Sequence, residues 1–216
     1  MRLFKKMLWW FAGHRSYKWV VQDWIKIADL DACGRVLLTE RFRVNLLPIL
    51  RKSPAKNQKV LVLSPHQDDE TIGAGGTLLL AARSGANVTC VYVTDGSLAS
   101  PSVPPKEMAE VREQEARRVW KVIGGQIIFW HYPDGGIPLD EIAAKKLADT
   151  VKENNPDVIF IPFFLEDHPD HRRVNHLLWL ARGIGLPKRI EIWAYQVWSG
   201  LIPNIAVDIT EVMEKS

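Results

Sequence analysis

The sequence predicts an α/β protein with a Rossmann-like layered fold, in which helices cover a mostly parallel sheet, and a helical, basic extension precedes it. Three observations support this prediction. Short apolar runs rich in Val, Ile and Leu alternate with longer amphipathic stretches from residue 59 onward. Gly- and Pro-containing turns separate many of them. The basic charge is concentrated before residue 60. Alternating strands and helices imply parallel strands joined by right-handed crossovers.

Each element has its own signal. The run at 59–63 (KVLVL) is typical of a strand buried on both faces, and the small-residue-rich helix after it ends at Gly85. The charged, amphipathic stretch from Lys106 ends at Gly124 and Gly125. The expected elements are, in order, a strand at 59–63, a helix at 72–84, a strand at 87–93, a helix at 106–123, a strand at 127–131, a helix at 139–153, a strand at 157–164, a helix at 170–182, and strands at 189–197 and 204–209.

The first part of the chain differs from the rest in composition. Residues 1–59 hold thirteen Lys or Arg against four Asp or Glu, a net charge of +9, which leaves −6 for the remainder. We therefore expect a basic extension and linker at 1–58 and a separate α/β domain at 59–216. Four of the nine tryptophans lie in the extension, at positions 9, 10, 19 and 24.

Composition also bears on partners and location. We expect the aromatic face of the extension to pack on the main domain, with peripheral contact to an anionic membrane through residues 1–58 as the alternative. Nucleic-acid binding is not expected, because a basic stretch alone supports it weakly. The two cysteines have no CxxC spacing, which favours a reducing, cytoplasmic location. The sequence contains no run of 18 apolar residues, so no membrane-spanning helix is predicted.

Two clusters of acidic residues and histidines follow the first and fourth expected strands. They are 64–70 (SPHQDDE) and 166–171 (EDHPDH). In the strand order 3-2-1-4-5 these two strands are neighbours, and ligands of such sheets bind beyond the carboxyl ends of the strands. His66, Asp69 and His171 would then converge as a three-ligand site for Zn²⁺ or another divalent metal, with a position left for water.

Four further residues of the clusters are assigned roles. Asp68 lies beside the ligands and is expected to act as general base toward water. His168 is expected to stabilise an oxyanion or protonate a leaving amine, oriented and held cationic by Asp170. Glu70 is expected to have a structural role, because a carboxylate is favoured near a helix N-terminus. Trp198, after the fifth strand, is expected either to stack on a sugar or to pack in the core.

The residues at 65–76 (PHQDDETIGAGG) resemble the signature of the LmbE-like/PIG-L family of zinc-dependent N-deacetylases, and 168–171 (HPDH) is similar to the family's second block. The resemblance covers roughly residues 59–209. Residues 94–96 (TDG), Arg112 with Glu115, and Asp134 with Gly135 are also similar to the family's pattern. Gln67 stands where the family usually has proline, which is expected to alter the stiffness of the loop more than its chemistry.

The resemblance implies the same Rossmann-like fold, the same three ligands and the same role for Asp68. It also places Arg112 near the carbonyl or acyl group of the substrate, whereas the alternative for this arginine is a helix-surface ion pair with Glu115. The implied reaction is hydrolysis of an N-acetyl amide on an N-acetylglucosamine-type sugar or glycoconjugate. Two alternatives remain at this stage: a metal-dependent hydrolase of another amide or an ester, and a non-catalytic sugar- or nucleotide-binding module.

Overall fold

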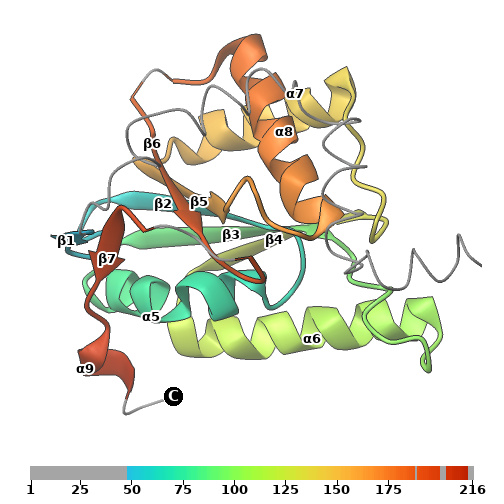
Figure 1. Ribbon diagram of the computed structural model, residues 1–216, viewed down its shortest axis with the longest axis horizontal. Helices are drawn as coiled ribbons and strands as arrows, with labels where there is room; N and C mark the ends of the chain where they lie inside the picture. The colour runs from blue at the N-terminus through green and yellow to red at the C-terminus, as the bar shows by residue number, and fades with distance from the viewer. Residues whose placement is uncertain (1–47, 188, 200–202, 214–216) are drawn as a thin grey trace, which may run out of the picture.

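The computed structural model describes residues 48–187, 189–199 and 203–213 (Figure 1). A five-stranded parallel sheet has the order β4-β3-β2-β5-β6, which is 3-2-1-4-5 when counted from the first predicted strand. The predicted fold class is therefore confirmed, and the sheet has the strand order on which the convergence of the two clusters depends. The elements are β1 Ile49–Arg51, β2 Lys59–Ser64, α5 Asp69–Arg83, β3 Asn87–Thr94, α6 Pro105–Ile123, β4 Gln126–Tyr132, α7 Glu141–Asn154, β5 Val158–Pro162, α8 Pro169–Gly185, β6 Glu191–Tyr195, β7 Ile205–Val207 and α9 Thr210–Met213.

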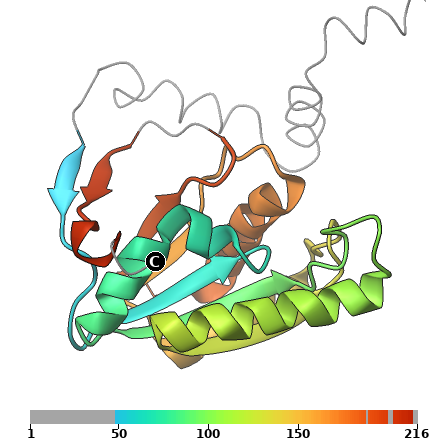
Figure 2. The same ribbon diagram turned by 90° about the horizontal axis from the view of Figure 1, so that it is seen from below.

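Helices cover both faces of the sheet, with α5 and α6 on one side and α7 and α8 on the other (Figures 1 and 2). The strand β2 shows how the sequence achieves this. Val60 and Val62 pack in the core on the α5–α6 side, whereas Leu61 and Leu63 pack in the core on the α7–α8 side. Successive side chains of a strand point to opposite faces, so an uninterrupted apolar run supplies both cores at once.

The helix α5 begins at Asp69, three residues earlier than expected. The chain turns directly from β2 into the helix, which places Asp69 and Glu70 in its first turn. Carboxylates are favoured there by the positive end of the helix dipole. The early start matters for function, because it makes one of the predicted metal ligands the first residue of a helix.

Glu70 is fully buried and holds β2, β3 and α6 together. Its carboxylate accepts hydrogen bonds from the hydroxyls of Ser64 and Tyr92 and from the indole N–H of Trp120. Burial raises the pKa of Glu70, and the hydrogen bonds from Tyr92 and Ser64 oppose that rise. The structural role expected for Glu70 is thus observed, but as a buried acceptor shared by three elements rather than as a surface charge.

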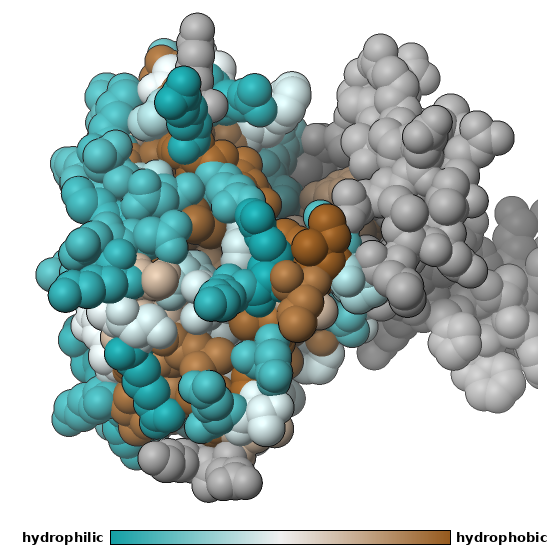
Figure 3. Space-filling model, turned by 90° about the vertical axis from the view of Figure 1, so that its left-hand side faces the viewer, coloured by the Kyte–Doolittle hydropathy of each residue, from teal (hydrophilic) through white to brown (hydrophobic). Residues whose placement is uncertain are grey.

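The last predicted strand forms, but it does not join the main sheet. β7 pairs in parallel with β1, a strand that the sequence analysis did not predict. Arg51 of β1 makes an ion pair with Glu191 of β6. Ile49 and Leu50 remain exposed on β1, and Figure 3, which shows the molecule from the side where β1 lies in Figure 1, shows apolar surface among hydrophilic side chains.

The tryptophan-rich helices expected before residue 48 lie outside the described residues, and the domain boundary at residue 58 stays a prediction. Within the part of the chain that the structure describes, no helix has the length and apolar character needed to cross a membrane.

The helix α5 packs closely against the end of β6. A Cβ added to Gly73 would lie 2.3 Å from Cδ2 of Tyr195 and 2.6 Å from the carbonyl oxygen of Gln196. The second of these atoms belongs to the backbone and cannot rotate away. Glycine at position 73 is therefore required for the helix to approach this strand.

We predict that Gly73→Ala lowers the free energy of unfolding by about 1–3 kcal/mol, because the added methyl group overpacks this contact. Gly75→Ala is the matched control on the same helix: its nearest neighbour, Cγ2 of Thr71, would lie 3.5 Å away. At position 75 the added methyl group makes only ordinary contacts, and alanine restricts the backbone of the unfolded chain more than glycine does. We therefore expect Gly75→Ala to raise the free energy of unfolding by about 0.5–1 kcal/mol. Urea unfolding of both variants measures the difference, and equal effects would contradict the assignment.

Candidate metal centre and active site

The two predicted clusters meet at the carboxyl ends of β2 and β5, which are neighbours in the sheet. The turn after β2 carries His66 and Asp68 and leads into α5 at Asp69. The turn after β5 carries His168, the N-cap of α8, and His171 lies in the first turn of that helix. Parallel pairing of β2 with β5 therefore brings together residues that are far apart in the sequence.

The carboxylate of Asp69 is the centre of the cluster. One oxygen, Oδ2, accepts hydrogen bonds at 3.0 Å from both the backbone N–H and the Nδ1 of His66. The same oxygen lies 3.1 Å from Nε2 of His171. Asp69 and His171 are buried, and the His66 side chain is 14% exposed. The structure thus brings the three predicted ligands into mutual contact.

This contact shifts the pKa values of Asp69 and His66. Burial alone would raise the pKa of Asp69, but its contacts with His171 and His66 outweigh burial and lower that pKa. Burial would lower the pKa of His66, but Asp134, Asp170 and Asp69 together raise it well above its ordinary value. In the absence of a cation the cluster therefore stabilises a protonated His66 facing carboxylates.

His171 shows that this cluster fits a metal ion. Its ring is completely buried, yet neither ring nitrogen has a hydrogen-bond partner of suitable geometry among the described residues. Nε2 lies close to Asp69, and Nδ1 lies 3.9 Å from a carboxylate oxygen of Glu166. A buried polar atom without a partner costs about 1–3 kcal/mol. A cation that takes imidazole nitrogen and carboxylate oxygen would satisfy Nε2.

Two more carboxylates surround His66. Nε2 of its ring lies 3.2 Å from Oδ1 of Asp134 and 3.4 Å from Oδ2 of Asp170. A carboxylate on the outer nitrogen of a ligand histidine fixes the orientation of the ring and raises its basicity. The sequence analysis noted Asp134 only as part of the family pattern. Its position in the turn after the third predicted strand, at the same edge of the sheet, is the signal that could have placed it in the site.

The donor atoms can be grouped in more than one way. One ring nitrogen each from His66, His168 and His171 lie within 4.8 Å of one another, as do donor atoms of His66, Asp134 and Asp170. Neither group is the predicted set of His66, Asp69 and His171, which stays a prediction.

His168 differs from its expected partnership. Its Nδ1 accepts a hydrogen bond from the backbone N–H of Asp170, which caps α8, so the ring is neutral with its proton on Nε2. Burial and the neighbouring His66 and His171 lower the pKa of His168 to about 4. The carboxylate of Asp170 meanwhile accepts from the backbone N–H of Gly135 and lies near His66. These contacts favour a neutral His168 over the cation expected from pairing with Asp170, and the catalytic role of His168 stays a prediction.

Asp68 lies at the entrance, in a cavity of about 890 Å³ that it lines together with His66, Asp69, His168 and Arg112. The guanidinium of Arg112 connects Asp68, at 2.8 Å, with Glu115, at 2.9 Å. The ion pair with Glu115 that the sequence analysis considered is therefore present, and a second one to Asp68 accompanies it. Asp68 is 44% exposed and makes no contact with Asp69 or His171 among its described hydrogen bonds and ion pairs.

Gln67 explains how the chain manages without the usual proline. Its side chain is buried, and its amide donates a hydrogen bond to the carbonyl oxygen of Thr94. Gly96, with φ of +64°, allows the close approach, because a Cβ there would lie 2.2 Å from the Gln67 oxygen. The turn after β2 is thereby fixed to the turn after β3 by a side chain rather than by a rigid ring.

Glu166 is the residue whose role the sequence analysis did not assign. It is completely buried, and its carboxylate accepts hydrogen bonds from three consecutive backbone N–H groups, those of Val197, Trp198 and Ser199. The turn after β5 is therefore joined to the turn after β6.

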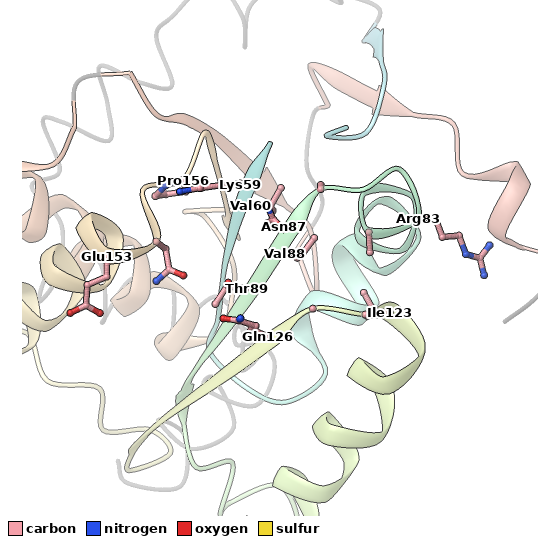
Figure 4. A pocket seen from close by; sticks show the side chains of 15 residues that line it. Lys59, Val60, Arg83, Asn87, Val88, Thr89, Ile123, Gln126, Glu153 and Pro156 are labelled. Atoms are coloured by element: carbon pink, nitrogen blue, oxygen red, sulfur yellow. The ribbon is translucent and has the colours of Figure 1, made fainter. Parts of the chain in front are cut away.

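A second cavity lies at the opposite, amino-terminal ends of the strands (Figure 4). Its lining includes Lys59, Asn87, Gln126 and Glu153, and it contains none of the predicted site residues. The histidines and carboxylates described above belong to the carboxyl edge, where open α/β sheets bind their ligands.

Comparisons with known proteins agree with this geometry. The chain is 30% identical over 175 residues to the diacetylchitobiose deacetylase of Thermococcus kodakarensis, which covers 73% of this chain and 66% of that protein. It is 29% identical over 168 residues to the 1D-myo-inositol 2-acetamido-2-deoxy-α-D-glucopyranoside deacetylase of Kineococcus radiotolerans, covering 59% of this chain and 46% of that protein. The chain thus spans less than two thirds of the length of either curated relative.

Solved structures show the same fold. The N,N'-diacetylchitobiose deacetylase from Pyrococcus horikoshii superposes with a TM-score of 0.62 and 29% identity, over 87% of this chain and 76% of that one. A 4-carboxy-2-hydroxymuconate hydratase from Pseudomonas putida has a TM-score of 0.63 over 73% of this chain and 75% of that one, but at 22% identity it shows only a shared fold.

Residues 61–181, more than half of the chain, match the family model described as PIG-L, GlcNAc-PI de-N-acetylase. That match includes residues 61–64 of β2, all of β5 and both clusters of the site. The resemblance seen in the sequence is thereby confirmed, and the chain belongs to the PIG-L (LmbE-like) family.

Proposed function

We propose that this protein is a zinc-dependent hydrolase that removes the N-acetyl group from an N-acetylglucosamine-type sugar or glycoconjugate. The observation that carries the proposal is the contact of one Asp69 oxygen with the imidazoles of His66 and His171. The ring of His171 is buried, and its nitrogens have no hydrogen-bond partner of suitable geometry among the described residues. Membership of the family and the similarity to sugar deacetylases support the substrate class.

His66, Asp69 and His171 would hold the metal. Two imidazole nitrogens and one carboxylate oxygen are a ligand set that suits zinc and leaves a position free. A metal bound there supplies Lewis acidity that polarises the amide carbonyl and acidifies a water molecule. Asp134 and Asp170 orient His66 from the opposite side of its ring.

The remaining residues handle protons and charge. Asp68 accepts a proton from the attacking water, and its ion pair with Arg112 holds its carboxylate at the entrance of the cavity. The Nε2–H of neutral His168 donates a hydrogen bond to the oxygen that becomes negative as the amide is attacked. Arg112 lines the same cavity and contributes positive charge near the acyl group.

The first prediction concerns His171. His171→Ala should lose the bound zinc and the release of acetate from N-acetylglucosamine glycosides, because it removes one of three ligands. His131→Asn is the control, since His131 is exposed and lies outside the cluster, and asparagine tolerates its φ of +55°. Elemental analysis and an acetate assay on the same preparations measure both effects, with circular dichroism to check folding. Retention of zinc in folded His171→Ala would contradict the ligand assignment.

The second prediction separates the base from the ligands. Asp68→Asn should retain about one zinc per chain while kcat falls about 10²- to 10⁴-fold, because general-base catalysis is lost and the ligands are untouched. Glu115→Gln removes the other partner of Arg112 and leaves Asp68 in place, so its kcat should change far less. Equal kcat values for Asp68→Asn and the wild type would show that another group accepts the proton.

The third prediction follows from the raised pKa of His66. Zinc binds only the deprotonated imidazole, so zinc affinity should rise with pH until the pH passes the pKa of His66. Asp134→Asn removes a carboxylate that raises this pKa, so the affinity should level off at a lower pH. Competition with a chromophoric chelator between pH 5.5 and 8.5 measures this, with exposed Asp149→Asn as the control. An unchanged profile for Asp134→Asn would contradict the coupling.

A further inference from the structure

Two aromatic residues near the end of β6 have opposite environments. Tyr195 is buried and donates a hydrogen bond from its hydroxyl to the carbonyl oxygen of Leu63, so it belongs to the core. Trp198 is 66% exposed and lines the cavity that also contains His66, Asp68 and Arg112. Of the two outcomes considered for Trp198 from the sequence, core packing does not occur.

The backbone at Trp198 is fixed although its side chain is exposed. Oε1 of Glu166 accepts from the N–H of Val197 at 2.6 Å, and Oε2 accepts from the N–H of Ser199 at 3.1 Å. The N–H of Trp198 lies between them, at 3.2 Å and 3.0 Å from the two oxygens. Hydrogen bonds to a carboxylate are about twice as strong as neutral ones. Because this backbone is anchored, binding a ligand needs to order only the two χ angles of the indole.

The same carboxylate also lies beside the reacting centre. Oε2 of Glu166 is 3.9 Å from Nδ1 of His171, and Glu166 precedes His168 by two residues. The backbone at Trp198 is therefore hydrogen-bonded to the turn that leads into His168 and the first turn of α8. A ligand held against the indole would keep a constant distance from the cluster.

We propose that Trp198 is an aromatic platform for a pyranose ring in the cavity and that Glu166 is the residue that positions it. This inference rests on the proposed function, because it specifies how the sugar of that substrate is bound. One face of a pyranose presents C–H groups and packs on an aromatic ring, while its hydroxyls suit the charged residues across the cavity. The cavity, at about 890 Å³, is in the size range of small-molecule sites.

The test measures binding of methyl β-glucosaminide, a glycoside without the acetyl group, which the enzyme cannot hydrolyse. Isothermal titration gives Kd for the wild type and for Trp198→Ala, Trp198→Phe and Trp179→Ala. Trp179 is the matched control, because it is 70% exposed on α8 and does not line the cavity. We expect Kd to rise about tenfold in Trp198→Ala and by about two- to threefold in Trp198→Phe, and to stay unchanged in Trp179→Ala.

The role of Glu166 is tested by a double-mutant cycle with Glu166→Gln, which replaces one of the two acceptor oxygens by an NH₂ group. If Glu166 acts through Trp198, Glu166→Gln raises KM in the wild-type background but adds nothing to KM in Trp198→Ala. An effect on kcat, transmitted through His171, should persist in both backgrounds. Additive effects on KM would overturn the positioning role.

The outcomes distinguish this inference from the proposed function. Equal Kd values for Trp198→Ala and Trp179→Ala, or no saturable binding of the glycoside to the wild type, would overturn the inference whether or not acetate is released. Binding that depends on Trp198 in a protein that releases no acetate would support the platform and contradict the hydrolase.

Discussion

The contact of the Asp69 carboxylate with His66 and His171 is the interaction on which the site depends. It exists because β2 and β5 are parallel neighbours whose carboxyl ends lie together. In a strand order that did not place β2 beside β5, the two clusters would be separated by at least one strand. A carboxylate at this depth is stabilised only by groups that approach it closely, so the sheet topology and the electrostatics of the site are two aspects of one constraint.

Buried carboxylates perform a similar task elsewhere in the molecule. Glu70 accepts hydrogen bonds from side chains of β2, β3 and α6, and Glu166 accepts three backbone N–H groups from the turn after β6. Each carboxylate connects segments that are distant in the sequence, and each requires fixed donors because an unpartnered buried charge is costly. The turns that carry His66, His168 and Trp198 are thus held by directional hydrogen bonds, which determine positions more sharply than apolar packing does.

The fold alone does not specify the reaction. A hydratase from Pseudomonas putida shares this architecture at low identity, whereas sugar deacetylases share both the architecture and more of the sequence. The proposed activity therefore rests on the cluster: a buried imidazole whose nitrogens have no hydrogen-bond partner among the described residues, a carboxylate between two rings, and a half-exposed Asp68 that lines the cavity. Within the proposed reaction, the lowered pKa of His168 favours a role as neutral hydrogen-bond donor over a role as cation.

The sequence by itself determined the class of fold, the succession of strands and helices along the chain and the two clusters, because apolar runs, helix periodicity and the spacing of His and Asp are local properties of the chain. The order of the five strands within the sheet was assumed from the fold class and is fixed by tertiary pairing. Only the tertiary structure decided which carboxylates face His66, why His168 is neutral, and that the backbone at Trp198 is anchored by Glu166. The pairing of β1 with β7 also escaped sequence analysis. These features depend on contacts between segments brought together by the sheet, and no local pattern encodes the distance between them.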